Sequence, residues 1–104
     1  MREPGHFEVS GGRNGDTEHL RLGGELDIAS IADLQAALEA TSATRLVLDL
    51  SGLTFIDSSG AAALVRAQQE AASEGRTVAL RAPSKPVARV FGLLGMASVL
   101  ETAD

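Results

Sequence analysis

Residues 45–50, RLVLDL, restrict the possible folds more than any other segment, because apolar β-formers follow one another there with only Asp49 between them. A half-buried strand alternates polar and apolar residues, whereas a nearly continuous apolar run is typical of a strand covered on both faces. Strands of that kind occur in parallel sheets, whose connections are usually helices. The run therefore predicts the central strand of a sheet with helices packed on it.

Before this strand, the chain predicts a hairpin and a helix. Apolar residues alternate with polar ones on both sides of the glycine-rich residues 11–15, which predicts two strands joined by a turn. Asp27 follows as a predicted N-cap, and the helix after it extends to about Ala40. Its apolar residues recur at spacings of three and four and form one stripe that faces the sheet: Ile28, Ile31, Ala32, Leu34, Ala37 and Leu38.

After the central strand, two more helices and a strand are predicted. The acid, two serines and glycine of residues 57–60 precede an alanine-rich helix that Gly75 ends. Residues 77–81 (TVALR) have the composition of a strand, and residues 86–94 have apolar residues at helical spacing. The tail, residues 96–103, adds a short edge strand or a last helical turn.

This alternation of strands and helices predicts the α/β class. We expect a single domain over residues 1–104, with a mixed, mostly parallel sheet of four to five strands and packed helices built from successive βα units. A chain of 104 residues buries roughly two-thirds of the surface that its unfolded form exposes. Such a core needs neither a disulfide nor a metal ion to hold it.

The composition excludes several functions. The chain contains no Cys and two His, which excludes disulfides and thiolate catalysis and argues against a multi-histidine metal site. Its net charge of −5, with scattered Arg residues and three Phe as the only aromatics, argues against nucleic-acid binding, which needs a basic face. No apolar run approaches the ~20 residues of a membrane span, and no leader precedes Phe7, so we expect a cytoplasmic protein.

The glycines and serines match neither of two known site patterns. Ser58 or Ser59 lies at a strand-to-helix junction, as a hydrolase nucleophile does, but residues 56–60 (IDSSG) have an isoleucine and an acid where the Gly-x-Ser-x-Gly elbow needs glycine. A phosphate loop needs Gly-x-x-x-x-Gly-Lys-Ser/Thr, and the sole lysine, Lys85, does not stand in such a loop. The glycines are therefore interpreted as turn residues, and a serine enzyme is kept as an alternative.

The junction residues also have a structural interpretation. Asp27 and Asp57 each precede a predicted helix, where a carboxylate accepts backbone N–H bonds and stabilises the helix by roughly 0.5–2 kcal/mol. Asp57 and Ser58 both suit the cap of the second helix, so Ser59 is surplus to it and is expected to project toward solvent. A hydroxyl there is accessible to a kinase, and a phosphate added to it meets free backbone N–H groups.

Residues 48–60, LDLSGLTFIDSSG, resemble the signature of STAS domains, and in particular of bacterial anti-sigma factor antagonists. Residues 24–27 (GELD) are similar to that family's second motif, and residues 90–95 (VFGLLG) are similar to its third-helix segment. The similarity therefore spans nearly the whole chain in the same order. Residues 61–63 are all alanine where relatives often carry bulkier apolar residues, which leaves the identity of the partner open.

The resemblance implies a function. In that family, the serine or threonine before the glycine is phosphorylated by the anti-sigma factor, an ATP-dependent serine kinase, and in this chain that residue is Ser59. The unphosphorylated antagonist binds the anti-sigma factor and so frees a sigma factor for transcription, and a metal-dependent serine phosphatase reverses the modification. ATP and metals belong to the partners, so we expect no cofactor and no enzymatic activity in this chain. The partner-binding residues implied are Asp27, Asp57, Ser58, Ser59 and Gly60.

The resemblance leaves a second role open. STAS domains also occur as subunits of lipid-transport complexes and in stress-sensing assemblies. In such a role the chain is a constitutive scaffold, and Ser59 serves only as a helix cap. The two roles therefore differ in whether Ser59 is modified.

Overall fold

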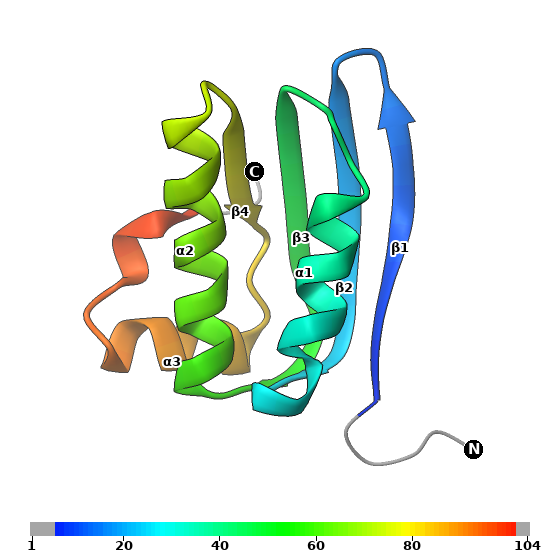
Figure 1. Ribbon diagram of the computed structural model, residues 1–104. Helices are drawn as coiled ribbons and strands as arrows, with labels where there is room; N and C mark the ends of the chain where they lie inside the picture. Colours follow the sequence, from blue (N-terminus) through cyan, green and yellow to red (C-terminus); the bar gives the residue numbers. More distant parts are fainter. Residues whose placement is uncertain (1–5, 102–104) are drawn as a thin grey trace.

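One sheet of five strands forms the middle of the structure, a computed structural model that describes residues 6–101 (Figure 1). In their order across the sheet, the strands are β1 (Phe7–Asn14), β2 (Thr17–Leu26), β3 (Arg45–Ile56), β4 (Thr77–Arg81) and β5 (Leu100–Glu101). β1 and β2 are antiparallel, and every later pair of neighbours is parallel. The predicted α/β class, with a mixed and mostly parallel sheet, is confirmed.

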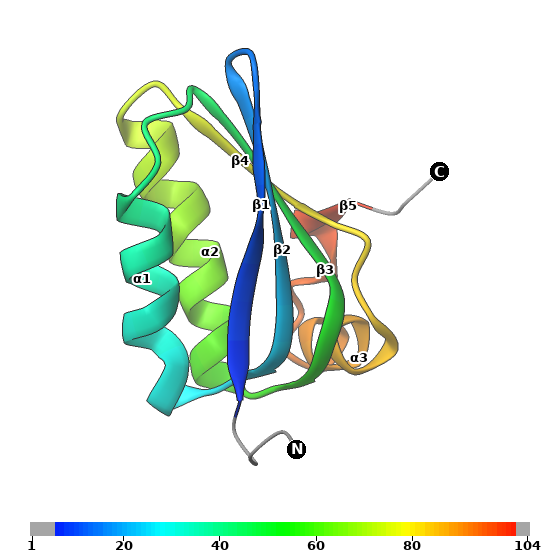
Figure 2. The same ribbon diagram turned by 90° about the vertical axis from the view of Figure 1, so that its right-hand side faces the viewer.

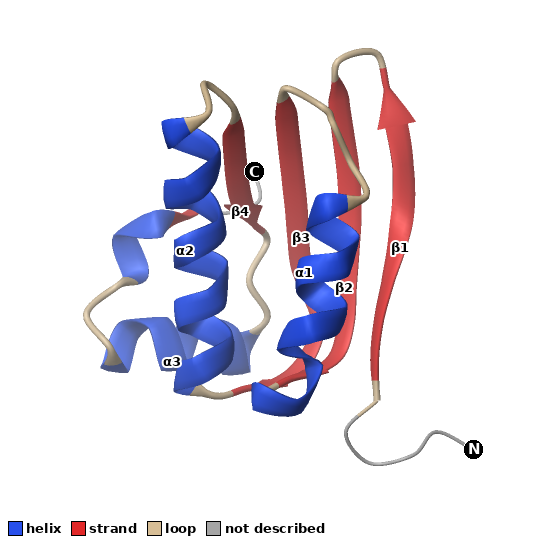
Figure 3. Cartoon of the chain, in the orientation of Figure 1, coloured by secondary structure: helices blue, strands red, loops and turns tan. Residues whose placement is uncertain are grey.

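Helices cover both faces of this sheet. α1 (Ile31–Glu39) and α2 (Ser58–Ser73) lie side by side on one face, and α3 (Lys85–Leu93) lies on the other (Figure 1 and Figure 2). Two short 3-10 turns, η1 (Ile28–Ser30) and η2 (Ala97–Val99), precede α1 and β5. Figure 3 shows strands and helices alternating along the chain after the opening hairpin, as the predicted βα units require.

The tail forms both of the elements that the sequence left as alternatives, a helical turn and a short edge strand, and its last two predicted residues, 102 and 103, lie outside the described residues. Among residues 6–101, no helix is long and apolar enough to cross a membrane.

The central strand β3 is buried on both faces, as the apolar run predicted. Leu46, Val47 and Leu48 follow one another, yet each is at most 3% exposed. Burying one such side chain stabilises a fold by roughly 1.5–3 kcal/mol. The helices supply much of the remaining core, including Leu34 of α1, Leu64 of α2, and Val87 and Phe91 of α3.

The hairpin turn is shorter than the glycine-rich residues 11–15 predicted. β1 continues to Asn14, and only two residues connect it to β2. A Cβ at Gly11, whose φ is 145°, would lie 2.0 Å from the carbonyl oxygen of His19 in β2. Glycine is needed at this position because the two strands approach closely, and not because the chain turns there.

The predicted apolar stripe of the first helix is wrong at Ile28 and Ala32. Ile28 is 75% exposed, and Ala32 is exposed as well. Residues 28–30 form the 3-10 turn η1, which has about three residues per turn, so the α-helical spacing does not extend back to them. The side of α1 that faces the sheet consists of buried Leu34 with half-buried Ile31, Ala37 and Leu38.

Candidate functional site

The carboxyl ends of β2 and β3 meet at one edge of the sheet, where η1 and α2 begin (Figure 1, lower edge). Leu26 and Ile56, the last residues of the two parallel strands, are paired there. The backbone N–H of Asp57 donates to the carbonyl oxygen of Leu26 at 3.3 Å. Asp27 and residues 57–60, which are distant in sequence, therefore form one site, called the junction site below.

Asp27 holds the turn η1 through a capping box with Ser30. Its Oδ1 accepts hydrogen bonds from the N–H of Ala29 at 3.1 Å and of Ser30 at 3.2 Å. In return, the N–H of Asp27 donates to Ser30 Oγ at 3.0 Å, and the Ser30 hydroxyl donates to the carbonyl oxygen of Glu25 at 3.0 Å. Ser30 was not among the predicted site residues, although a serine three residues after a predicted N-cap is a signal for this box.

Asp57 caps α2 in a similar way. Its Oδ1 accepts from the N–H of Gly60 at 2.8 Å. Both aspartates therefore have the capping role that the sequence predicted. Within residues 6–101, the Oδ2 atoms of Asp27 and Asp57 accept no hydrogen bond, so each half-buried carboxylate keeps one oxygen available to a partner.

Ser58 and Ser59 occupy the first turn of α2. The sequence distinguished them because Ser58 could cap the helix, but the structure does not give Ser58 that role. Asp57 caps the helix, so neither Ser58 nor Ser59 serves as its cap. Neither hydroxyl has a hydrogen-bond partner in the described chain. Ser58 is exposed, whereas Ser59 is half-buried and does not project fully into solvent as expected. Capping thus does not single out Ser59, whose assignment stays a prediction from the motif.

Gly60 is buried because two backbones approach each other at this point. A Cβ on Gly60 would lie 2.5 Å from the carbonyl oxygen of Leu26, which is too close for any side chain to fit without movement. Leu26 also covers Gly60 from the side of β2. Gly60 therefore contributes to the junction site by letting the end of β2 reach the start of α2.

The start of α2 has free backbone donors of the kind that bind anions at helix N-termini. The backbone N–H groups of Ser58 and Ser59 donate to no acceptor in residues 6–101, and the positive end of the helix dipole lies here. A serine nucleophile needs a base within hydrogen-bond reach of its hydroxyl. In the described part of the chain, neither serine hydroxyl bonds to a histidine. Within residues 6–101, the unbonded serine hydroxyls therefore lie beside free backbone N–H groups and are paired with no base.

Apolar side chains border the junction site. Ile28, directly after Asp27, is 75% exposed, and Phe55, two residues before Asp57, is 46% exposed. This apolar surface was not predicted, because helical spacing assigned Ile28 to the buried stripe. A signal for it lies in the capping box, which marks a turn before the α-helix proper.

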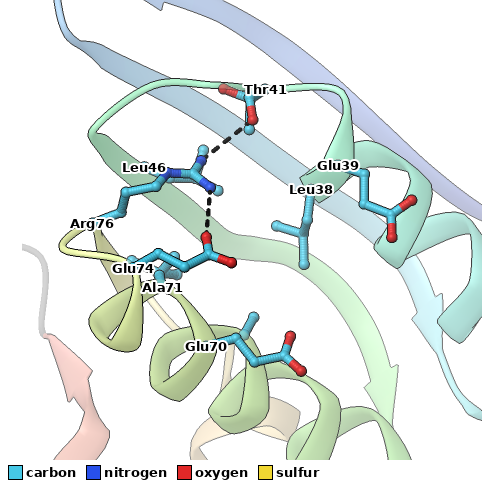
Figure 4. Close-up of a pocket in the computed structure, with 10 residues that line it drawn as sticks. Leu38, Glu39, Thr41, Leu46, Glu70, Ala71, Glu74 and Arg76 are labelled. Atoms are coloured by element: carbon cyan, nitrogen blue, oxygen red, sulfur yellow. Dashed lines mark hydrogen bonds and ion pairs between the residues drawn. The ribbon is translucent and has the colours of Figure 1, made fainter.

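A hollow of about 290 Å³ lies at the end of α1 and α2 that is opposite the junction site (Figure 4). Arg76 closes one side of it, since its guanidinium donates to the carbonyl oxygen of Thr41 at 3.3 Å and pairs with Glu74 at 3.4 Å. In the chain from 6 to 101, no group of three or more His, Cys, Asp or Glu is placed to hold a metal ion. The residues that line the hollow include the apolar Leu38, Leu46 and Ala71 and the acidic Glu39, Glu70 and Glu74.

The chain is similar to known proteins over most of its length. A protein-family model described as "Mlab, STAS domain" matches residues 9–101. The "Anti-sigma F factor antagonist" of Lysinibacillus sphaericus is 34% identical over 86 residues, which cover 78% of this chain and 73% of that protein. Both similarities include the junction site and the central strand.

Solved structures of anti-sigma factor antagonists share the fold. SpoIIAA in its unphosphorylated form matches with a TM-score of 0.72 and 25% identity over 95% of this chain and 89% of that one. The Bacillus cell fate determinant SpoIIAA in its phosphorylated form matches with a TM-score of 0.70 and 23% identity over 95% and 92%. An antagonist from Mycobacterium paratuberculosis has a TM-score of 0.82 at 20% identity, covering 98% and 89%, which shows the fold alone. Because the family model spans nearly all of the described residues, this chain belongs to the STAS domain family and is similar within it to the anti-sigma factor antagonists.

Proposed function

We propose that this chain is an anti-sigma factor antagonist whose binding is controlled by phosphorylation of Ser59. One observation carries the proposal: Ser59 stands directly before Gly60, as the phosphorylated residue of the family motif does, and its unbonded hydroxyl lies at the start of α2 beside two unused backbone N–H groups. The similarity to SpoIIAA, whose structure is known with and without phosphate, supports it. Asp27, Asp57 and Ser58 belong to the same binding surface, and Gly60 shapes it.

The physical basis of the control is charge. A phosphate adds about −1.5 to −2 charges at neutral pH to a chain whose net charge is −5. Free N–H groups at the start of α2 accommodate that charge in the free protein. In a complex, the same charge lies in a desolvated interface, where like-charge contacts cost several kcal/mol. Phosphorylation therefore lowers affinity and leaves the fold intact.

The partners follow from this role. The anti-sigma factor is the kinase that transfers phosphate from ATP to Ser59, and a metal-dependent serine phosphatase removes it. The unphosphorylated chain occupies the anti-sigma factor, and a sigma factor is released to activate transcription. The chain supplies a surface and an acceptor hydroxyl and no catalysis of its own, and it acts in the cytoplasm. The named relatives are antagonists, so the comparisons do not favour the constitutive scaffold.

Phosphorylation by purified partners tests the proposal. Each anti-sigma factor of the organism that encodes this chain is incubated with it and ATP, and the intact mass is measured. We expect one factor to add a single phosphoryl group to wild type and to Ser58→Ala, and none to Ser59→Ala. Ser58 is the matched control, because it is the more exposed of two neighbouring serines. Phosphate on Ser58 would contradict the site, and the absence of both binding and phosphorylation with every factor would contradict the function.

A further inference from the structure

Ile28 is an exposed apolar side chain that the fold does not use. Four large apolar residues are prominently exposed in residues 6–101: Ile28 (75%), Phe55 (46%), Leu93 (79%) and Leu94 (43%). Leu93 is the last residue of α3 and Leu94 is its C-cap, and this helix packs on the other face of the sheet (Figure 2). More than half of Phe55 is covered. Ile28 thus combines high exposure with a position beside the junction site.

The turn that carries Ile28 is held rigidly. Asp27 and Ser30, on either side of residues 28 and 29, form the capping box, and Ser30 is 3% exposed. The Ser30 hydroxyl lies within 3.2 Å of three oxygens, those of the Glu25 carbonyl, the Asp27 carbonyl and the Asp27 carboxylate. These hydrogen bonds restrain the backbone of the turn that carries Ile28. A partner that covers it does not have to order a flexible loop, which is a large part of the cost of association.

The same turn touches the start of α2. Leu26, two residues before Ile28, accepts a hydrogen bond from the N–H of Asp57 and lies against Gly60, the residue that follows Ser59. The turn η1 and the start of α2 both lie at the lower end of the molecule in Figure 1. A partner that covers the start of α2 from this end therefore also contacts η1. Isolated exposed apolar residues are common on protein surfaces. This one differs because its turn is fixed and adjoins the site of the modification.

We infer that Ile28 is an apolar anchor of the partner-binding surface, and that the anti-sigma factor has an apolar pocket beside the group that approaches Ser59. The inference rests on the proposed function and assigns to Ile28 a share of its affinity and specificity. A few residues carry most of the binding energy of an interface, and they lie in well-packed, desolvated pockets. A phosphate on Ser59 would then lie beside an apolar contact. Because that contact excludes the water that would screen the phosphate charge, the charge would weaken binding more strongly.

The test compares Ile28→Ser with Leu93→Ser. The two wild-type residues are similar in size and exposure, 75% and 79%, and lie on different parts of the fold, so they are matched controls for removing an exposed apolar side chain. Affinity for the anti-sigma factor that phosphorylates wild type is measured by titration calorimetry. We expect Ile28→Ser to weaken binding at least tenfold, Ile28→Val to retain it within threefold, and Leu93→Ser to leave it unchanged. Thermal unfolding should be the same for all four proteins.

A kinetic measurement separates an anchor from a structural effect. With the same anti-sigma factor as kinase, Ile28→Ser should raise the KM for this chain and leave kcat nearly unchanged, because the acceptor hydroxyl is untouched. Equal binding by wild type and Ile28→Ser overturns the inference while the proposed function stands. Equal weakening by Leu93→Ser also overturns it. Failure of wild type to bind any anti-sigma factor overturns the proposed function and the inference with it.

Discussion

The two ends of the helix pair α1 and α2 differ in what their polar side chains do. At the end far from Ser59, the Arg76 guanidinium donates to the carbonyl oxygens of Ala43 at 2.9 Å and Thr41 at 3.3 Å and pairs with Glu74. The Thr41 hydroxyl there bonds to a carboxylate of β2. At the junction site, the hydroxyls of Ser58 and Ser59 bond to nothing in residues 6–101.

This difference separates polar groups that hold the fold from those that are available to a partner. Satisfied, half-buried groups such as Arg76 contribute to stability, and their loss leaves backbone acceptors without donors. Unbonded groups in a helix's first turn contribute little to folding. Substitutions at the two ends should therefore affect different measurements, stability at one end and binding at the other.

The largest effect on stability is expected in the central strand β3, which lies between the two ends. Val47→Asp places an unpaired charge at a position that is 3% exposed, and we expect the free energy of unfolding to fall by more than about 3 kcal/mol. Chemical denaturation measures this loss. Thr77→Asp, at an exposed position of β4, is the control and should cost less than about 1 kcal/mol. A Val47→Asp variant as stable as that control would contradict the central position of β3.

Arg76→Met should have the second-largest effect, and this effect should be on stability and not on binding. The variant keeps most of the apolar stem and removes the hydrogen bonds that join the loops before β3 and β4, so we expect a loss of about 2 kcal/mol. Arg66→Met, an exposed residue of α2, removes the same charge and should cost almost nothing. Weaker binding to the anti-sigma factor in Arg76→Met alone, with unfolding unchanged, would reverse the roles assigned to the two ends.

Ser59→Asp should show the opposite pattern. The variant changes the net charge from −5 to −6 and places a carboxylate where helix N–H groups tolerate it, so its stability should lie within about 1 kcal/mol of wild type. Its affinity for the anti-sigma factor should fall at least tenfold, which is about 1.4 kcal/mol. Ser59→Ala should bind like wild type and resist inactivation by ATP. Ser42→Asp adds the same charge in the exposed loop at the far end and should bind normally; equal weakening by both acidic variants would indicate a general charge effect.

The smallest effect is expected from substitutions of Asp57, whose Oδ1 caps α2 and whose Oδ2 is free within residues 6–101. Asp57→Ala removes the bond to the Gly60 N–H and should cost about 1 kcal/mol of stability. Asp57→Ser restores a capping oxygen without the charge and should regain most of that loss. If Asp57 also contacts the partner, both variants should bind less tightly than wild type. Normal binding by Asp57→Ser would restrict Asp57 to its structural role.

Features that depend on neighbouring residues were predictable from the sequence. The apolar run of β3, the capping acids Asp27 and Asp57, and the helix stop at Gly75 are each written within a few consecutive residues, and the structure has all of them. The 48–60 motif pointed to the family in the same way, because a motif is a local string. Periodicity and capping act over one or two helical turns, so the chain determines them before it folds.

Features that depend on distant residues were decided by the tertiary structure. Arg76 bonds to carbonyl groups 33 and 35 positions earlier in the chain, and no local pattern indicates such partners. Gly60 must be glycine because the carbonyl oxygen of Leu26, at the end of β2, lies where a Cβ would stand. The exposures of Ile28, Ser58 and Ser59 depend on how η1 and α2 are placed on the folded chain. Burial and long-range hydrogen bonds exist only once the strands are paired and the helices packed, since they are properties of the arrangement and not of any one segment.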